Sequence, residues 1–341
     1  MGHTVAMSRP IAVIINPNAG RHRPAADARR LAAILGWQGR VFETESEHAV
    51  GPAVDEALAA GAQVIAISGG DGTLGGVLNA LLQRVGPDAL PLLTPTNSGT
   101  IDFVARKVQI KGDVEDIVAR LAAAFRSGTR PVRVEVDSLQ LTGHIRAPGM
   151  PETPFSQVGF ALAAGGIGQR FFSKYYEEPV LGARAIVQVV AQAVGSYALD
   201  RAGAPVPERY RAYGRAVFRP TLAEVSIDGQ RVPGNAHGAI HAGAFDVSLG
   251  GVFRVFPMAA EKGAIHFQAG AIIPGEMIRA LPALVRGSKI PSERLVEKKG
   301  YEMRVVPCSD EMLSLILDGE PIDYVSELQV VPGPAVGIVR V

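Results

Sequence analysis

A glycine-rich turn with an aspartate at its centre is the stretch of this sequence best suited to chemistry. Residues 64–67 are small or β-branched and apolar, which predicts a buried strand of a parallel sheet. The turn reads Gly69-Gly70-Asp71-Gly72-Thr73, and apolar residues then recur at helical spacing from Leu74. Bare backbone N–H groups and a helix N-terminus both favour anions, so the turn predicts a phosphate-binding site. A carboxylate repels phosphate, so Asp71 is expected to bind a metal, accept a proton or cap the helix.

Other polar turns follow neighbouring predicted strands. They are Asn16 with the residues after it, Thr44, and the run Ser98-Gly99-Thr100. Parallel strands bring their carboxyl ends to one edge of a sheet, where ligands bind, so these turns should converge. Arg21 follows the first turn and is a candidate phosphate clamp, because guanidinium binds phosphate through two parallel hydrogen bonds.

The elements that position these turns alternate between strand and helix. Strands are predicted at 11–15, 39–44, 64–67 and 90–93, and helices at about 25–35, 48–60, 74–82 and 114–126. This alternation predicts a doubly wound α/β nucleotide-binding domain over residues 9–130. Neither a dinucleotide fingerprint nor a Walker A loop is present.

From Pro131 onward the sequence changes to short apolar segments with period-two alternation, punctuated by glycine and proline. This pattern predicts an antiparallel β-sandwich domain over residues 131–321, and we expect the segment 322–341 to pack back on the first domain. Two helices interrupt the strands. One covers about 181–197 and is unusually apolar, and the other covers about 277–286, where Pro282 should kink or shorten it.

The composition limits the function classes. The 34 Lys and Arg residues balance the 33 Asp and Glu residues, which argues against a dedicated nucleic-acid binder. A single cysteine excludes an intramolecular disulfide, and no apolar run approaches about 18 residues. We therefore expect a cytoplasmic protein that contacts the inner membrane surface peripherally.

Four motifs occur in an order typical of one family. They are Asn16-Pro17-Asn18-Ala19-Gly20-Arg21, the turn 69–73, Ser98-Gly99-Thr100 before Asp102-Phe103, and Asp318-Gly319-Glu320. On these motifs the chain resembles, over nearly its whole length, the diacylglycerol kinase catalytic-domain family, the soluble lipid kinases that include sphingosine and ceramide kinases. The resemblance implies ATP- and Mg²⁺-dependent phosphoryl transfer to a lipid hydroxyl, in a cleft between the two domains. Diacylglycerol, ceramide and sphingoid bases remain open as acceptors.

The resemblance also implies roles for individual residues. Asp71 would bind metal or deprotonate the lipid hydroxyl, Asp318 is the other candidate base, and Glu320 completes the C-terminal acidic pair and is a second candidate metal ligand. The expected nucleotide ligands are Asn16, Arg21, Thr44, Gly69, Gly70, Gly72, Thr73, Ser98, Gly99 and Thr100. The lipid is expected to enter beside the apolar helix 181–197, unless that helix only packs in the core.

Departures from the family pattern keep alternatives open. The run Gly99-Thr100-Ile101-Asp102 lacks the family's Asn and is one residue shorter, and Lys262 occupies a position where a structural Mg²⁺ is often supported. The alternatives are an NAD-kinase-like phosphotransferase acting on a soluble substrate and a catalytically weak nucleotide- or lipid-binding protein. The accessory metal and a homodimer are left undecided.

Overall fold

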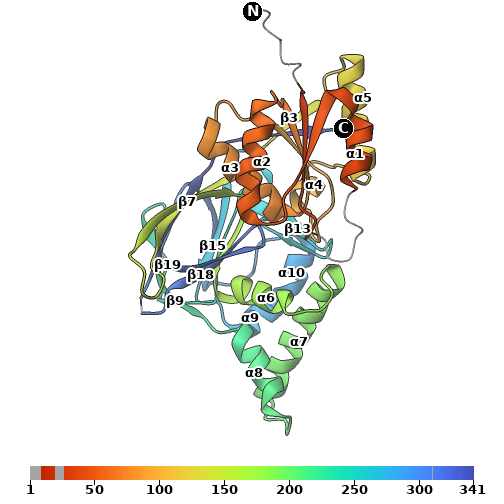
Figure 1. Cartoon of the computed structure of the whole chain (residues 1–341). Coiled ribbons are helices and arrows are strands. Elements are labelled where there is room, and N and C mark those ends of the chain that lie inside the picture. The colour runs from red at the N-terminus through yellow and green to blue at the C-terminus, as the bar shows by residue number, and fades with distance from the viewer. Residues whose placement is uncertain (1–8, 20–26, 309) are drawn as a thin grey trace, which may run out of the picture. The chain divides into compact units, whose positions relative to one another are not determined.

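The structure is a computed structural model that describes residues 9–19, 27–308 and 310–341. The chain divides into two units. The first contains the residues up to Val136 together with Ala335–Val341, and the second is Asp137–Pro334 (Figure 1). Arg21 lies outside the described residues.

The first unit is built on a six-stranded sheet in the order β2-β1-β3-β4-β20-β5. Its strands are β1 (Ile11–Ile15), β2 (Gly39–Glu43), β3 (Val64–Ser68), β4 (Leu92–Pro95), β5 (Val132–Val136) and β20 (Val336–Arg340). All neighbours are parallel except β5, which runs antiparallel to β20. Every residue of β1 and β3 is buried, which explains why β1 is continuously apolar and β3 is apolar up to its last residue, Ser68.

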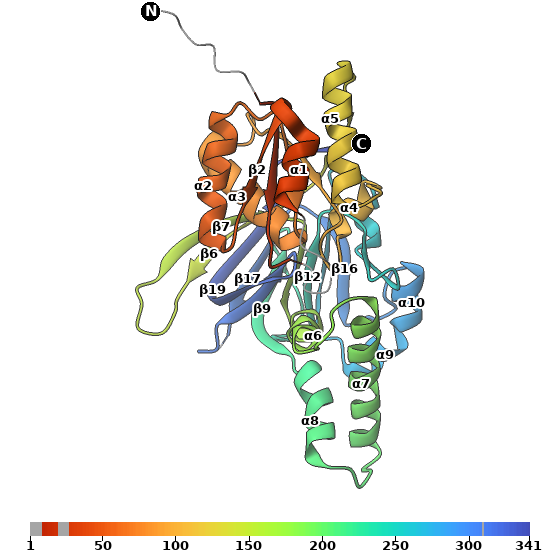
Figure 2. The same cartoon turned by 45° about the vertical axis from the view of Figure 1, so that its right-hand side comes forward.

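Helices cover both faces of this sheet (Figure 2). They are α1 (Ala28–Leu35), α2 (Glu47–Ala59), α3 (Asp71–Val85), α4 (Phe103–Lys107) and α5 (Val114–Ser127), with a 3₁₀ turn at Gly36–Gln38. Helices α1 and α5 pack together, and α2 packs against α3. Buried Leu31 of α1 and Leu121 of α5 pack on β1 and β3, each contributing about 1.5–3 kcal/mol through burial. The predicted α/β architecture is confirmed.

The boundaries of the first unit differ from the predicted ones. Strand β5 extends to Val136 and pairs with β20, so the unit continues past residue 130. The C-terminal segment that returns to the first sheet begins at Ala335 rather than at residue 322. The reason is that β19 (Glu320–Pro332) is a strand of the second sheet.

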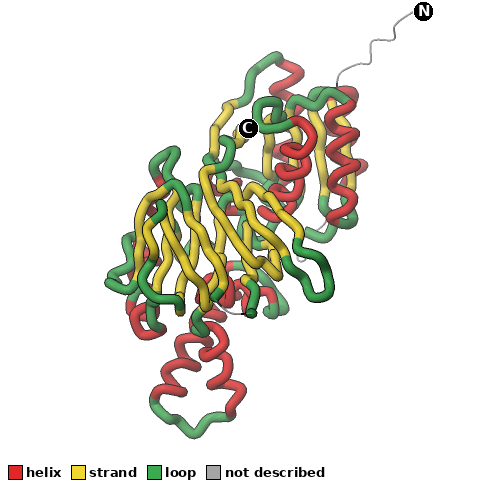
Figure 3. Tube along the Cα trace, turned by 90° about the vertical axis from the view of Figure 1, so that its left-hand side faces the viewer, coloured by secondary structure: helices red, strands yellow, loops and turns green. Residues whose placement is uncertain are grey.

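The second unit is antiparallel and rich in β-strands, as predicted (Figure 3). The long strand β19 pairs with three other strands of the second sheet. Along one edge of β19, β18 pairs with its first half and β17 with its second half, and β6 pairs along the other edge. The strands are β6 (Leu139–Ile145), β7 (Thr153–Gly159), β8 (Ala161–Gly165), β9 (Thr221–Ile227), β10 (Gln230–Arg231), β11 (Ala236–His237), β12 (Ala239–Gly243), β15 (Ile265–Gly270), β16 (Leu295–Gly300), β17 (Met303–Pro307) and β18 (Leu313–Leu317). A separate pair consists of β13 (Val247–Leu249) and β14 (Phe253–Val255).

Five α-helices are described in the second unit. They are α6 (Gly166–Tyr176), α7 (Ala183–Arg201), α8 (Glu208–Val217), α9 (Pro274–Arg279) and α10 (Leu281–Arg286), with a 3₁₀ turn at Pro257–Ala260. The predicted helix at 277–286 is broken at Ala280, because Pro282 lacks an N–H and instead occupies the first turn of α10. Among the described residues, no helix is both long enough and apolar enough to cross a membrane.

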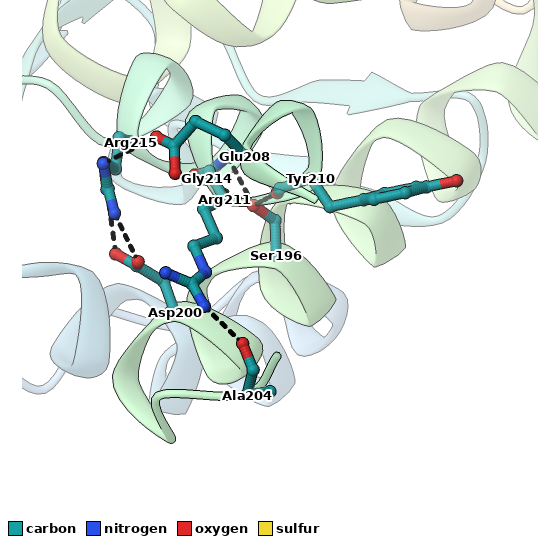
Figure 4. A network of polar contacts seen from close by, with 8 residues as sticks. All are labelled: Ser196, Asp200, Ala204, Glu208, Tyr210, Arg211, Gly214 and Arg215. Carbon is teal, nitrogen blue, oxygen red and sulfur yellow. Dashed lines mark hydrogen bonds and ion pairs between the residues drawn. The ribbon is translucent and has the colours of Figure 1, made fainter. Parts of the chain in front are cut away.

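Helices α7 and α8 form an antiparallel hairpin that projects from the second sheet, and polar contacts join them (Figures 1 and 4). Arg215 pairs with both Asp200 and Glu208. The Ser196 hydroxyl accepts a hydrogen bond from the Gly214 N–H at 2.7 Å and donates one to the Tyr210 carbonyl. The two helices therefore approach closely at Ser196.

We predict that Gly214→Val separates α7 from α8. A Cβ at this position would lie 2.7 Å from the Ser196 hydroxyl oxygen and 2.9 Å from the Tyr197 backbone nitrogen. The expected loss of unfolding free energy is about 1–3 kcal/mol, measured by chemical denaturation. Gly195→Ala is the matched control, because a Cβ there meets nothing within 4 Å. Equal stability of both variants would contradict the prediction.

Candidate functional site

The glycine-rich turn lies at the carboxyl edge of the first sheet, between β3 and α3. Helix α3 begins at Asp71, and its N-cap is Gly70, whose backbone is extended and which provides no side-chain cap. The N–H groups of a first helical turn have no carbonyl acceptor within the helix. Together with the positive end of the helix dipole, they make this end of α3 suited to phosphate.

Two turns at the carboxyl edge of the first sheet, the one after β3 and the one after β4, contact each other through glycine backbone atoms. A Cβ on Gly99 would lie 2.4 Å from the Cα of Gly70 and 2.5 Å from Oδ1 of Asp102, which accepts a hydrogen bond from the Gly99 N–H at 2.9 Å. A Cβ on Gly69 would lie 2.4 Å from the Thr73 hydroxyl oxygen. The structure therefore brings together Gly70 and Gly99, so a side chain at position 99 would push the two turns apart, and a side chain at position 69 would displace Thr73 within its own turn.

Asn16 connects the first turn to α3. Its side-chain amide donates a hydrogen bond to the Thr73 hydroxyl at 3.0 Å, and its backbone N–H donates to the Ser68 carbonyl at 2.8 Å. Its amide oxygen accepts from the Asn18 N–H at 3.0 Å, which holds the Asn-Pro turn in place. Asn16 thus positions the phosphate turn, which is the predicted phosphate-binding turn at residues 69–73.

The remaining predicted nucleotide ligands have different surroundings. The Ser98 hydroxyl lies 3.2 Å from that of Ser68 and 2.9 Å from that of Thr96, in a small hydroxyl cluster. Thr100 is exposed, and Gly72 is the second residue of α3. Thr44 is buried, and its hydroxyl donates to the Ile15 carbonyl at 3.0 Å, so that its proton is used in linking β2 to β1.

The Asp71 side chain forms hydrogen bonds with the N-terminus of a second helix, α4. Its carboxylate accepts hydrogen bonds from the N–H groups of Phe103 at 3.1 Å and Val104 at 3.3 Å, the first two residues of α4. Asp71 therefore caps α4, whereas the N-cap of its own helix is Gly70. A carboxylate offers about four acceptor positions, so this cap is compatible with a ligand contact.

Asp318 occupies a tight turn of the second unit, between β18 and β19. Both it and Gly319 have positive φ, of 52° and 94°. The carboxylate is buried and accepts hydrogen bonds from the N–H groups of Phe160 at 2.9 Å and Ala161 at 2.8 Å. Burial raises the pKa of this carboxyl to about 7, although the two N–H groups lower it, and the Glu320 charge raises it further. A pKa near neutrality suits a proton acceptor.

The two proposed metal ligands belong to different units, Asp71 to the first and Glu320, which is exposed, to the second. Within the described residues, no three His, Cys, Asp or Glu side chains form a group that could hold a metal ion. Mg²⁺ is commonly bound by one or two carboxylates together with substrate phosphates rather than by a protein cage. Asp71, at the phosphate turn, fits that kind of site.

The segment around Lys262 is tied to other parts of the second unit. Glu261 forms an ion pair with Lys299, and the Gly263 N–H donates to the Asp137 carboxylate at 2.6 Å. Glu261 in this segment thus binds a lysine of the protein, and the Asp137 carboxylate binds the segment's backbone.

An apolar cavity of roughly 150 Å³ lies within the second unit. The hairpin helix α7 contributes Val190, Ala193 and Val194, and α6 contributes Phe171 and Phe172. His241 and Gln268 are the two lining residues with polar side chains. The cavity lies beside the apolar helix predicted at 181–197, and it suits a hydrocarbon chain.

Comparison with known proteins bears on both units. Residues 10–134 match the diacylglycerol kinase catalytic domain. The match covers the turn 69–73 and the turns containing Asn16 and Ser98. No curated protein matches the sequence.

Solved structures match across the whole length. A diacylglycerol kinase from Bacillus anthracis strain Sterne has a TM-score of 0.60 at 13% identity, covering 98% of this chain and 97% of that one. A second structure from the same strain, provisionally described as a diacylglycerol kinase, has a TM-score of 0.65 at 12% identity with the same coverage. At this identity they establish a shared fold of both units.

Several residues of the candidate site are not evident from the sequence. The donors to the Asp71 carboxylate are backbone N–H groups 32 and 33 residues away. Gly159 packs against Asp318, since a Cβ there would lie 2.7 Å from Oδ2. A polar residue inside an apolar strand is the signal that could have indicated His241 and Gln268.

We predict that Gly99→Ala disrupts the contact between the two turns. The added methyl group overlaps Gly70 and Asp102, so the unfolding free energy should fall by about 1–3 kcal/mol. Thermal and chemical denaturation measure the effect. Gly76→Ala within α3 is the control, because its Cβ meets nothing within 4 Å and alanine favours a helix. A Gly99→Ala protein as stable as the control would contradict the contact.

We also predict that Asp318 makes stability depend on pH. Its pKa is raised from 3.8 to about 7 on folding, so the native state binds the proton more tightly. The stabilisation is complete below about pH 4 and is lost as pH rises through about 7. The unfolding free energy of the wild type, relative to Asp318→Asn, should therefore fall over this range. Parallel pH profiles of the two proteins would contradict the raised pKa.

Proposed function

We propose that the protein is an ATP-dependent lipid kinase, which transfers the γ-phosphate to the hydroxyl of a lipid such as a diacylglycerol, a ceramide or a sphingoid base. The observation that carries the proposal is the glycine turn at the N-terminus of α3, in the region that matches the diacylglycerol kinase catalytic domain. The apolar cavity of the second unit supports a lipid acceptor.

The first unit would bind the nucleotide. The backbone of Gly70, Gly72 and Thr73 provides N–H groups for the β- and γ-phosphates, and Asn16 fixes the Thr73 hydroxyl. Arg21 is proposed as a phosphate ligand. Mg²⁺, when bound, would neutralise phosphate charge, and Asp71 is the carboxylate at the turn that would hold it.

Asp318 is the better candidate for the proton acceptor. Its pKa of about 7 leaves a substantial ionised fraction at neutral pH, and the ionised form is basic enough to take a hydroxyl proton. As the lipid oxygen bonds to the γ-phosphorus, its proton passes to the Asp318 carboxylate and the bond from phosphorus to the ADP oxygen breaks. Glu320 contributes by raising the pKa of Asp318.

The lipid would place hydrocarbon in the cavity beside α7, where apolar side chains exclude water. Such a substrate resides in membranes, so we also propose that the protein works at a membrane surface. An NAD-kinase-like activity on a soluble substrate would give this cavity no role.

A catalytically weak binding protein is the second candidate. It is favoured by the hydrogen bonds that the Asp71 carboxylate accepts from the first N–H groups of α4, which give this carboxylate a structural use. Turnover distinguishes the two candidates, because both would bind nucleotide and lipid.

The proposal predicts phosphate transfer from labelled ATP, with Mg²⁺, to a lipid in a panel of diacylglycerol, ceramide and sphingoid bases. Asp318→Asn should lower kcat by about 10²- to 10⁴-fold, the usual contribution of a general base. Asp323→Asn is the matched control, since Asp323 is exposed on the same strand as Glu320. Nucleotide binding with no phosphorylated lipid in the wild type would contradict the kinase proposal and favour the binding protein.

A further inference from the structure

A row of polar residues crosses three neighbouring strands next to the apolar cavity. His241 of β12 pairs directly with Gln268 of β15, which pairs directly with Glu297 of β16. The Gln268 amide nitrogen donates to Glu297 at 2.9 Å, and the Gln268 amide oxygen lies 3.4 Å from Nδ1 of His241. The three side chains thus form a continuous hydrogen-bonded chain that ends at the cavity.

Glu297 lies at one end of this chain and acts there as a hydrogen-bond acceptor. Its Oε2 accepts from the Ile290 N–H at 2.7 Å, and its Oε1 lies 3.1 Å from Nε2 of His266. Nδ1 of His266 accepts from the Met258 N–H at 3.3 Å, so Nε2, the nitrogen that lies 3.1 Å from Glu297, carries a proton. Burial raises the pKa of Glu297, but the hydrogen bonds from His266, Gln268 and Ile290 lower it below its usual value. The group is therefore an ionised acceptor.

The proton position on His241 follows from this arrangement. Because Gln268 must turn its nitrogen toward the carboxylate, it turns its oxygen toward His241. An amide oxygen only accepts, so Nδ1 of His241 carries a hydrogen. Burial lowers the pKa of His241 to about 4, so the ring is neutral and Nε2 carries a lone pair.

The His241 ring that carries this lone pair belongs to the lining of the apolar cavity. Nε2 of His241 is buried and has no hydrogen-bond partner among the described residues. It lies against Gly168, where an added Cβ would be 2.3 Å away, and both residues line the cavity. A buried acceptor without a donor is costly, so the site is complementary to a ligand that carries one.

We propose that Nε2 of His241 accepts a hydrogen bond from a hydroxyl or amide N–H located on the otherwise apolar part of the ligand. This inference rests on the proposed function for the lipid nature of the ligand. The cavity would then prefer a hydroxylated or amide-linked chain to a plain ester-linked one, because esters and hydrocarbon provide no donor.

Measurements of lipid binding in the absence of nucleotide test the inference. Displacement of a fluorescent fatty acid would give the affinities of stearic acid and of hydroxystearic acids with the hydroxyl at successive positions. A second arm would compare ceramide with a diacylglycerol of the same chain length. In at least one of these comparisons, we expect the ligand with the hydrogen-bond donor to bind roughly 3- to 10-fold more tightly than the ligand without it. In the first comparison this is the best hydroxystearic acid against stearic acid, and in the second it is ceramide against the diacylglycerol. The arm that shows the preference identifies the source of the donor.

Two variants separate the hydrogen bond from the apolar contacts. His241→Phe retains an aromatic ring and should abolish the preference, whereas Val190→Ala, also in the cavity lining, should weaken both ligands of a pair equally. The inference is overturned if neither arm shows a preference, if no chain binds, or if His241→Phe retains the preference.

The ¹⁵N resonance of His241 in the wild type provides a measurement independent of the variants. We expect Nε2 to be unprotonated in the free protein and to shift as a hydrogen-bond acceptor on addition of the preferred ligand. A protonated Nε2 would overturn the inference. A protein that binds these ligands with the expected preference but transfers no phosphate would contradict the kinase proposal and leave this inference standing.

Discussion

The backbone contact between Gly70 and Gly99 is the constraint on which the phosphate turn depends. With a Cβ on residue 99 only 2.4 Å from Gly70, any side chain there would separate the turns that follow β3 and β4. The hydrogen bonds that Asp71 accepts from the start of α4 join the same two turns, and the hydrogen bond from Asn16 to Thr73 adds the turn that follows β1. Preorganised N–H groups of this kind stabilise developing charge without reorganising during the reaction.

The second unit shows a different way of holding charged groups. Asp318 and Glu297 are both buried carboxylates that accept backbone N–H groups, but their pKa values move in opposite directions. Glu297 gains hydrogen bonds from two side chains, His266 and Gln268, and becomes more acidic. At Asp318 burial outweighs its N–H partners, and the negative charge of Glu320 adds to the effect. The first arrangement fixes proton positions, and the second produces a group able to exchange a proton.

Local signals in the sequence account for the elements that were predicted correctly. The apolar runs of β1 and β3 and the glycine turn between β3 and α3 depend on neighbouring residues, so their types and order could be predicted. The proline at 282 likewise marked the end of a helix, although it begins α10 rather than kinking one long helix.

Long-range contacts explain what the sequence did not reveal. The return of the C-terminal segment was expected, but its start at Ala335 depends on pairing of β20 with β4 and β5, which no local pattern encodes. Thr44 was predicted as a nucleotide ligand, and the sequence did not indicate that its hydroxyl also donates to the Ile15 carbonyl across the strand pair. The capping of α4 by Asp71 and the cavity beside α7 also arise from residues far apart in the chain. Candidate residues can thus be chosen by type, whereas their partners come only from the fold.

The pH dependence of lipid phosphorylation tests the central claim most directly, because it requires both turnover and the perturbed carboxyl group. If Asp318 accepts the hydroxyl proton, kcat/KM for the lipid should rise with pH through about 7 and then level off. This rise of kcat/KM with pH should be absent from the residual activity of Asp318→Asn. A wild-type rate that is flat between pH 5.5 and 8.5, about 1.5 pH units to either side of that pKa, would contradict the account, as would a rise that survives in the variant.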